Sequence, residues 1–431
     1  MSDLAAVQAE VQGYRQRLDS LLLYGDVLQT PPGQAFLALL DALNSTESSL
    51  ILKSYGIWFR ALAAEDMGWG QYLLQQIAYA ENPFTTAAQR LDYASLPSAL
   101  VQAAGHDLDQ LQRVYRLSGD QIAGWVQAIA HLLESPLAWA TEQSFAPTLP
   151  LPMAAPWASA VADLAQHYRQ HGAGLFAQYR AFTWHGGAMQ GIAEPDPIRL
   201  DQLTAYDHPR QQLLQNTLAL LKGYPALNVL LYGSRGSGKS SLVKGLVNEY
   251  APQGLRLVEV SKADLQALPQ IVGDLKSRPQ KFIIFVDDLS FEEDDDTFKA
   301  LKVVLEGSTT ARPANVVVYA TSNRRHLVRE YFSDRPRPSD QDEVQSWDTL
   351  QEKLSFSDRF GLTLTFEAAD QPTYLAIVHH LAHQANIPLA EADLTARALQ
   401  WATRHNGRSG RSARQFIDWL TAESDLSPKE R

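Results

Sequence analysis

Apolar residues recur at helical spacing through the N-terminal part of the chain. From Leu4 to about Gln143 they follow the i, i+3, i+4 pattern of successive amphipathic helices, as in SLILKSYGIWFRALAAE and WGQYLLQQIAYAE. The same stretch has no evident strand-like alternation. Its tryptophans and tyrosines also fall at helical spacing, which favours a packed core over a ligand site. The pattern predicts an all-α region over residues 1–195.

A proline-rich stretch, APTLPLPMAAP, interrupts the helical pattern. Proline fixes its own backbone and lacks an amide hydrogen, so a linker or rigid bend is expected near residues 144–156. A further helical run extends from Trp157 to about Phe182.

After about Glu194 the pattern changes to short apolar runs that alternate with helical segments. This alternation is typical of a parallel sheet with crossover helices, and the continuous apolar character of the runs predicts strands buried on both faces. The candidate strands are NVLLYG from Asn228, LRLVEV from Leu255, KFIIFVD from Lys281, NVVVYAT from Asn315 and GLTLTF from Gly361. From about Asp370 the pattern is helical again. We therefore predict an α/β core over residues 196–367 and a small helical unit over 368–431.

The first candidate strand runs into a glycine-rich motif. Residues 233–240 read GSRGSGKS, which matches the phosphate-loop pattern GxxxxGK[ST] between a strand and a helix. Such glycines let backbone amides and the helix N-terminus face phosphate oxygens. Lys239 is expected to contact the β- and γ-phosphates of ATP, and Ser240 to bind Mg²⁺. The predicted nucleotide-binding residues here are Gly233, Ser234, Arg235, Gly236, Ser237, Gly238, Lys239, Ser240 and Ser241.

Two carboxylates end the third candidate strand, in KFIIFVDDLSF. The carboxyl ends of parallel strands meet at one edge, so both are expected beside the phosphate loop. Asp287 is predicted to bind Mg²⁺, and Asp288 to act on the attacking water as general base. Alternatively, the two residues open a solvated acidic loop, since FEEDDD follows directly. The run from Glu292 to Asp296 is itself interpreted as a solvated face.

These features together resemble the AAA+ superfamily of ring-forming ATPases, over roughly Ile198 to Phe416. Three later matches, at Asn323, Arg359 and Arg411, narrow the likeness beyond the phosphate loop, which other P-loop proteins share. In NVVVYATSNRRHL, Asn323 resembles the sensor residue that orients the attacking water, with a plain turn residue as the alternative. In LSFSDRFGLTLTF, Arg359 resembles the arginine finger that reaches ATP on a neighbouring subunit. The resemblance thus implies a homo-oligomer.

Three further positions follow from the same resemblance. Arg411, in GRSGRSARQF, resembles the second sensor of a helical lid, and Arg414 is the alternative at that position. The lid is then the unit over residues 368–431. Tyr206 falls where AAA+ proteins often line the adenine pocket, although a packing role fits it equally.

The segments YGSRGSGKSSLVK, FVDDLSFE and SDRFGL are also similar to a bacterial family catalogued as domain of unknown function 815. That likeness supplies no substrate. It implies that the ATPase module is the shared part, and that the N-terminal helical region is an accessory part with an unknown protein partner.

Several departures from the AAA+ pattern bear on activity. AAA+ enzymes usually carry glutamate where this chain has Asp288, whose side chain is one methylene shorter, so slow turnover is expected. The segment SKADLQALPQIVG lacks the aromatic residue of threading unfoldases, which disfavours polypeptide threading. The polar segment from Tyr331 to Gln351 is predicted to be a flexible insert.

Composition excludes several other classes of function. The chain has 431 residues, enough for two or three domains, and no cysteine, which excludes disulfides and thiolate chemistry and fits a reducing cytoplasm. It contains no apolar stretch near the roughly 18–20 residues of a membrane span, and its start lacks a signal-peptide pattern. The net charge of -11 disfavours nucleic acid as a partner.

Two residual patterns receive the simpler interpretation. The pairs His379 and His383, and His167 and His171, are each four apart but lack an apparent third metal ligand, so packing or surface roles are favoured. The arginines at 324–325 and from 404 to 414 coincide with the expected ATP site, which disfavours a nucleic-acid role for them.

The sequence thus predicts an AAA+-type ATPase that binds Mg-ATP, hydrolyses it slowly and moves its helical region against a macromolecular partner. A nucleotide-dependent switch or scaffold that binds ATP to assemble, with little turnover, is the alternative, supported mainly by Asp288. A small-molecule P-loop kinase is less favoured, because the lid and finger motifs would have no role in it.

Overall fold

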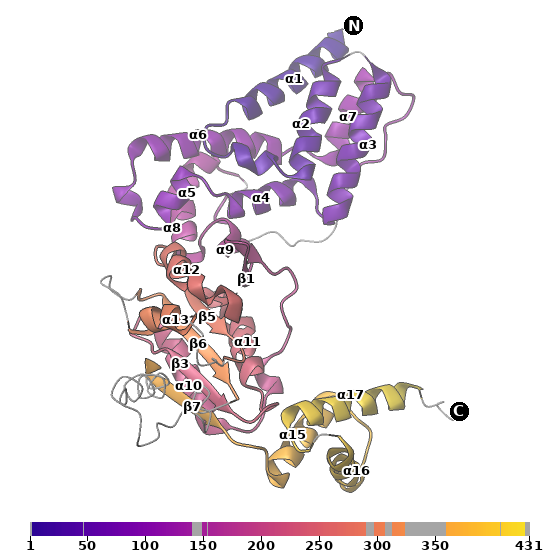
Figure 1. Ribbon diagram of the computed structural model, residues 1–431. Coiled ribbons are helices and arrows are strands. Elements are labelled where there is room, and N and C mark those ends of the chain that lie inside the picture. Colours follow the sequence, from indigo (N-terminus) through magenta and orange to yellow (C-terminus); the bar gives the residue numbers. More distant parts are fainter. Residues whose placement is uncertain are drawn as a thin grey trace. The chain divides into compact units, whose positions relative to one another are not determined.

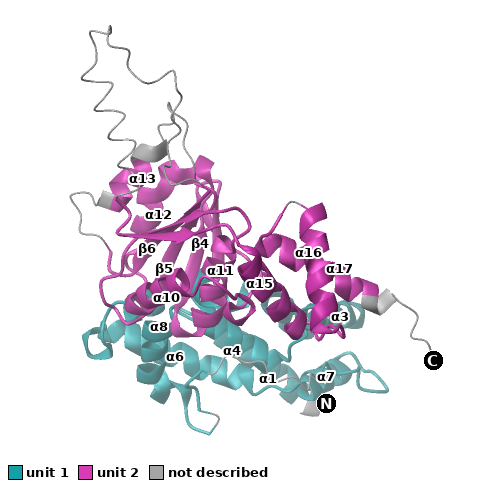
Figure 2. Cartoon of the chain, turned by 90° about the horizontal axis from the view of Figure 1, so that it is seen from below, with its two compact units in different colours: residues 1–178 teal, residues 179–431 magenta. Residues whose placement is uncertain are grey.

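A computed structural model describes residues 2–45, 47–139, 149–152, 154–289, 297–306, 313–323, 359–405 and 407–426. The chain divides into two compact units, residues 1–178 and 179–431 (Figure 2). Three predicted features lie outside the described residues: the acidic run Glu292–Asp296, the arginine pair at 324–325 and the insert Tyr331–Gln351.

The described residues of the first unit form helices and no strand, which confirms the all-α prediction (Figure 1). Its α-helices are α1 (Ser2–Asp19), α2 (Pro31–Leu43), α3 (Ser48–Glu65), α4 (Trp69–Tyr79), α5 (Pro83–Ala88), α6 (Ser98–Tyr115), α7 (Gly119–Ile129), α8 (Val161–His171) and α9 (Leu175–Gln178). Short 3-10 helices are η1 (Gly25–Leu28), η2 (Tyr93–Ser95) and η3 (Trp157–Ala160).

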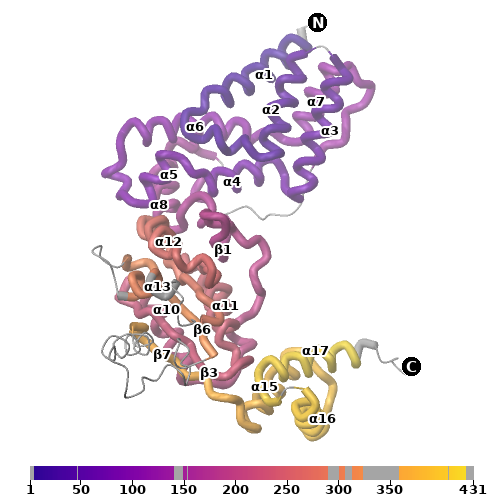
Figure 3. Tube along the Cα trace, viewed as in Figure 1, coloured from indigo at the N-terminus to yellow at the C-terminus, as the bar shows by residue number. Residues whose placement is uncertain are grey.

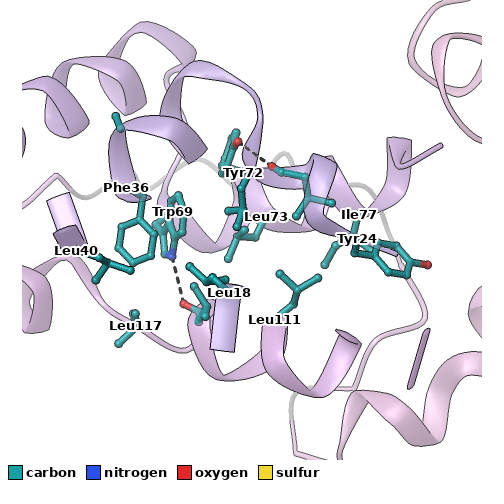
Figure 4. Packing of buried hydrophobic residues seen from close by; sticks show 14 of the residues in the cluster. Leu18, Tyr24, Phe36, Leu40, Trp69, Tyr72, Leu73, Ile77, Leu111 and Leu117 are labelled. Carbon is teal, nitrogen blue, oxygen red and sulfur yellow. Dashed lines mark hydrogen bonds between the residues drawn. The ribbon is translucent and has the colours of Figure 1, made fainter. Parts of the chain in front are cut away.

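An aromatic cluster forms the centre of this unit, as the helical spacing predicted (Figure 4). The Phe36 and Trp69 rings lie 4.3 Å apart between centroids, and Trp58 lies 6.0 Å from each of them. The indole nitrogen of Trp69 finds a hydrogen-bond acceptor on the backbone. Trp69 Nε1 donates to the Val114 carbonyl at 3.2 Å, so α4 is fastened to the end of α6.

A buried carboxylate organises the connection that follows α1. Asp107, on α6, is fully buried and accepts hydrogen bonds from three consecutive backbone amides, those of Leu22, Leu23 and Tyr24. The shortest joins Leu23 N to Asp107 Oδ2 at 2.6 Å. Backbone amides that lose water without gaining a hydrogen-bond acceptor are costly. These three amides belong to no helix or strand that would supply acceptors, and the Asp107 carboxylate supplies them instead.

The second unit is built on a seven-stranded sheet of order β2-β1-β4-β5-β6-β3-β7. All neighbouring strands are parallel except β1 and β2, which form an antiparallel hairpin. The strands are β1 (Ala181–His185), β2 (Ala188–Gly191), β3 (Val229–Gly233), β4 (Leu255–Glu259), β5 (Lys281–Val286), β6 (Val316–Ser322) and β7 (Leu362–Phe366). Every strand predicted from the sequence is present, and β6 is buried along its whole length.

The hairpin β1–β2 differs from the sequence prediction. The sequence predicted helix as far as Phe182 and a domain boundary at residues 195/196, whereas the helical unit ends at Gln178 and β1 begins at Ala181. The difference has a physical reason. The amide of Leu257 on β4 donates to the Arg180 carbonyl at 3.0 Å, and Phe182 pairs with Val258, so this segment extends the parallel sheet.

Helices complete the second unit (Figure 1). Those of the α/β core are α10 (Asp207–Leu221), α11 (Lys239–Tyr250), α12 (Leu268–Leu275) and α13 (Thr297–Glu306), with 3-10 helices η4 (Leu200–Gln202), η5 (Ala251–Gln253) and η6 (Lys262–Ala267). Figure 3 traces the chain from β7 into the C-terminal helices α15 (Gln371–Gln384), α16 (Glu391–Arg404) and α17 (Gly410–Leu426), which share their own apolar core. The fold class predicted from the sequence is thus confirmed: an α/β parallel-sheet core with a C-terminal helical lid and an all-α N-terminal region. Within the described residues, no helix combines the length and the apolar character required to span a bilayer.

We predict that Asp107→Ala destabilises the helical unit by about 3 kcal/mol, since three backbone amides, of which that of Tyr24 is buried, lose their acceptor. Urea unfolding of the full chain, followed by near-ultraviolet circular dichroism of the buried tryptophans, measures this change. Glu134→Ala, at an exposed position, is the matched control. Equal midpoints for both variants would show that the Asp107 hydrogen bonds contribute nothing to stability.

Candidate functional site

The turn between β3 and α11 has a backbone conformation, with positive φ at three positions, that only glycine adopts easily. Gly233 has φ of 132°, and a Cβ atom there would lie 2.0 Å from the carbonyl oxygen of Phe366 on β7. Ser234 N donates to that same oxygen at 2.8 Å. Gly236 and Gly238 also have positive φ, of 73° and 87°. The predicted phosphate loop therefore forms, and it is anchored to the neighbouring strand at its first residue.

Helix α11 begins at Lys239, directly after the loop. The first amides of a helix have no partners within it, so they are available to an anion at this end. Inside the loop, Ser237 Oγ donates to the Ser234 carbonyl at 2.9 Å, which closes the turn without using those amides. This combination of open amides and a helix N-terminus is suited to phosphate oxygens.

The ammonium group of Lys239 lies along the loop. Its Nζ donates to the carbonyls of Gly233 at 3.0 Å and Ser234 at 2.7 Å, and lies 3.5 Å from Asn323 Oδ1. Burial lowers the pKa of Lys239, and the carboxylates of Asp287 and Asp288 oppose that shift. The positive charge is thus placed between the loop and the ends of β5 and β6.

The two predicted carboxylates lie at this same edge of the sheet. Ser240 Oγ donates to Asp287 Oδ1 at 2.7 Å, and Asn323 Nδ2 donates to Asp288 Oδ1 at 2.6 Å. Asp288 adopts a left-handed backbone, with φ of 51°. Three parallel strands, β3, β5 and β6, therefore bring together five predicted site residues: Lys239, Ser240, Asp287, Asp288 and Asn323.

The donor atoms here fit a hard divalent cation. Mg²⁺ prefers oxygen ligands and is commonly held by one or two carboxylates plus phosphate oxygens. The Ser240 hydroxyl and the Asp287 carboxylate supply two oxygens within hydrogen-bond distance of each other, next to the phosphate loop. They are the residues that would hold Mg²⁺, as the sequence predicted.

A cavity of about 730 Å³ opens beside the loop. One wall is apolar and comes from both the core and the lid, through Ile198, Leu203, Ile377 and Leu381. The other predicted residues that line it are Arg235, Gly236, Ser237, Gly238, Ser241, Arg411 and Arg414. The cavity thus combines charged and polar side chains of both signs with apolar ones, which is the character of a site for a phosphorylated ligand with an apolar group.

The lid touches the phosphate loop directly at the start of α17. Arg411 N donates to the Gly236 carbonyl at 3.2 Å, and a Cβ atom on Gly410 would lie 2.9 Å from that oxygen. Ser412 N donates to Ser409 Oγ at 3.1 Å, so this helix end is capped beside the loop. The contact brings both lid arginines, Arg411 and Arg414, to the cavity and leaves either of them available as the lid sensor.

Tyr206 does not line this cavity. It has φ of 58° and immediately precedes α10, its hydroxyl donates to the Glu367 carbonyl at 2.8 Å, and its ring lies 5.4 Å from that of Phe366. Those contacts tie the start of α10 to the end of β7. The apolar wall beside the loop instead includes Leu203, three residues earlier in the chain.

Arg359 is also apart from the cavity. It precedes β7, whose last residue Phe366 pairs with Gly233 and whose first residue Leu362 pairs with Val229. Arg359 therefore lies at the sheet edge opposite the phosphate loop, separated from it by the five residues of β7, which span about 16 Å.

Sequence reasoning missed several residues of the site. Thr321 lines the cavity and was available from strand alternation, because it stands two residues before Asn323 on the same face. Gln202, Thr204 and Gln415 carry no motif that marks them.

The histidine pairs lie elsewhere. The rings of His167 and His171 stack at 4.5 Å in the helical unit, where burial and then the neighbouring His171 lower the pKa of His167 to about 4. His379 Nε2 lies 3.0 Å from Thr395 Oγ1 within the lid. Among the residues that the structure describes, no group of three His, Asp or Glu side chains is arranged to hold a metal.

Comparisons with known proteins place this site in a family. A family model described as "Protein of unknown function (DUF815)" matches residues 177–424. The Thermotoga maritima RuvB Holliday junction branch migration motor is similar at 14% identity over 52% of this chain and 72% of that chain, with a TM-score of 0.32. AMPPCP-bound DnaA from Aquifex aeolicus is similar at 19% identity over 55% of this chain and 70% of that chain, with a TM-score of 0.38. No curated protein shows significant similarity.

We predict that Gly410→Ala breaks the contact between lid and loop, because the added methyl group would collide with the Gly236 carbonyl. Hydrogen exchange at the Arg411 amide should then accelerate, by roughly tenfold for the loss of about 1.4 kcal/mol of hydrogen bonding. Gly273→Ala in α12, where a Cβ atom meets nothing within 4 Å, is the control. Unchanged exchange in the Gly410 variant would contradict the contact.

Proposed function

The chain belongs to the DUF815 family, and we propose that it is an AAA+-type ATPase that binds Mg-ATP, hydrolyses it slowly and couples the nucleotide state to its lid. One observation carries the proposal. The phosphate loop, the Ser240–Asp287 pair and the Asp288–Asn323 pair lie at one edge of the parallel sheet, around one cavity. This is the set of groups that phosphoryl transfer from a nucleotide requires.

Binding of ATP follows from the charges and shape of the cavity. The loop amides and Lys239 would receive the phosphates, and the apolar wall would receive the base. Ser240 and Asp287 would hold Mg²⁺, which neutralises phosphate charge when bound. Arg411 or Arg414 would contact the nucleotide and so couple its state to the position of the lid, because the start of α17 contacts the loop.

Hydrolysis depends on how Asp288 and Asn323 hold water. We assign Asp288 as the general base. Asn323 would orient the Asp288 carboxylate toward the attacking water, since Asn323 Nδ2 donates to that carboxylate at 2.6 Å. An aspartate has a shorter reach than the glutamate usual in AAA+ enzymes. Turnover is therefore expected to be slow.

The position of Arg359 supports action in trans. A finger must contact the γ-phosphate, yet Arg359 lies at the sheet edge opposite its own phosphate loop. A second copy of the chain, joined head to tail, would bring Arg359 to a neighbouring site. This assembly explains a finger motif that is out of reach of its own active centre.

The helical unit is proposed to contact a protein partner and to move against it when the nucleotide state changes. Its separate aromatic core supports this role, because a unit with its own core can move as a body. A nucleotide-dependent switch with little turnover is the second candidate. The shorter side chain of Asp288, where AAA+ enzymes usually carry glutamate, favours it, since a carboxylate with less reach holds the attacking water less well.

We predict that Arg359→Ala lowers ATP turnover at least about 1,000-fold while ATP affinity stays within about twofold. Phosphate release measured against protein concentration, beside sizing in ATP, tests this. Wild-type specific activity should rise with concentration, and the surface variant Arg90→Ala should behave like the wild type. Activity that is independent of concentration in the wild type would exclude a finger in trans.

Asp288→Asn separates the two candidate functions. For an ATPase, this variant should bind ATP normally and lose at least about 100-fold in turnover, because the amide cannot accept a proton. For a switch, assembly in ATP and function in the cell would be unaffected. Single-turnover hydrolysis and a growth assay with the chromosomal variant together distinguish the two outcomes.

A further inference from the structure

The turn that carries both site carboxylates is fastened to β6 at one residue, Thr321. Its hydroxyl donates to Asp287 Oδ1 at 2.5 Å and accepts from the Asp288 amide at 2.9 Å. Its carbonyl accepts from the Leu289 amide at 2.7 Å. Three consecutive residues of the turn are thus held by a single residue that is only 2% exposed.

The polarity of these hydrogen bonds is fixed by chemistry. An ionised carboxylate only accepts, so the Thr321 hydroxyl must donate its hydrogen to Asp287 and can only accept from the Asp288 amide. The β-branched side chain also restricts rotation about χ1, which keeps the hydroxyl aimed at the turn. Serine would retain both bonds with more freedom, whereas valine has the same shape and can form neither.

Asp288 needs such support because its backbone is left-handed. A non-glycine residue at φ of 51° is strained by about 1 kcal/mol or more, although aspartate tolerates this conformation better than most residues. Hydrogen bonds to Thr321 and Asn323 hold it there. Its amide donates to Thr321 Oγ1, and its carboxylate accepts from Asn323 Nδ2. Thr321, near the end of β6, and Asn323, directly after it, therefore both face the turn.

The same hydroxyl also determines how Asp287 is turned. Asp287 Oδ1 accepts from Thr321 and from Ser240, so hydrogen bonds from β6 and α11 fix the rotation of the carboxylate between them. Hydrogen-bonded neighbours of metal ligands orient those ligands, and their loss typically weakens metal binding by about 10–100-fold.

We propose that Thr321 is a positioning residue, which orients Asp287 for Mg²⁺ and holds Asp288 in its left-handed conformation. This inference rests on the proposed function and assigns the magnesium dependence of ATP binding to one hydroxyl. Thr321 itself touches neither the phosphates nor the attacking water in this role. It acts through the Asp287 carboxylate and the Asp288 backbone amide, and so gives the short side chain of Asp288 a defined position.

The test compares Thr321→Val with Thr321→Ser in the full chain. Binding of a fluorescent ATP analogue is titrated in Mg²⁺ and again in EDTA. For Thr321→Val, affinity in EDTA should stay within about twofold of the wild type, while affinity in Mg²⁺ falls about tenfold or more and half-saturation by Mg²⁺ shifts upward in proportion. Thr321→Ser should restore most of the magnesium dependence.

Thr217→Val is the matched control. Thr217 is fully buried in the same unit, and its hydroxyl bonds to the Leu213 carbonyl and to Tyr319, away from the cavity. If this variant loses magnesium dependence as strongly as Thr321→Val, general weakening of the core accounts for the effect and the inference is overturned. Should Thr321→Val fail to fold by circular dichroism, Thr321→Ala replaces it in the same titrations.

The outcomes separate this inference from the function on which it rests. A wild-type chain that binds no ATP overturns the proposed function, and the inference with it. A wild type that binds ATP more tightly in Mg²⁺, beside a Thr321→Val variant with the same magnesium dependence, overturns the inference alone.

Discussion

Parallel pairing of β3, β5 and β6 is the constraint on which the site depends. Strands that run in the same direction and in register end at one edge, and here each continues into polar residues. The loop after β3 supplies the amides and the lysine, the turn after β5 supplies the carboxylates, and the end of β6 supplies Thr321 and Asn323. Hydrogen bonds between these three segments, rather than any single residue, give the site its shape. A shift of one residue in either pairing would turn Thr321 and Asn323 away from the turn that they hold.

The sequence predicted most of this arrangement because its signals are local. A glycine pattern at fixed spacing requires backbone that few other loops adopt, and a buried strand followed by two aspartates leaves those carboxylates at the sheet edge. The signals for the hairpin β1–β2 were weaker. Its strand AFTWH follows helix without a clear break, although the next two residues, Gly186 and Gly187, form a tight turn of positive φ. This segment forms a strand because it pairs with β4, which lies far along the chain.

Other parts of the site were beyond sequence reasoning, because they form only when distant segments fold together. The apolar wall joins Leu203 of the core to Ile377 of the lid, and neither stands in a motif. Thr321 looks like an ordinary strand residue, since threonine is common in strands. Only its hydrogen bonds to three consecutive residues of the neighbouring turn distinguish it. Likewise, a tyrosine at a promising position proved to pack against Phe366 outside the cavity, because its hydroxyl reaches the Glu367 carbonyl.

The lid and the turn after β5 both line the cavity, and the hydrogen bonds that hold them differ in length. The turn is held by short bonds from one buried residue, whereas the lid meets the loop through an amide–carbonyl contact of 3.2 Å between Arg411 and Gly236. Movement that follows the nucleotide state should therefore occur at the lid. The carboxylates would remain in place, since Thr321 holds the Asp287 side chain and the Asp288 amide, and Asn323 holds the Asp288 carboxylate. Under the proposed function, this division would let the lid respond to the ligand while the residues assigned to Mg²⁺ and water stay fixed relative to the sheet.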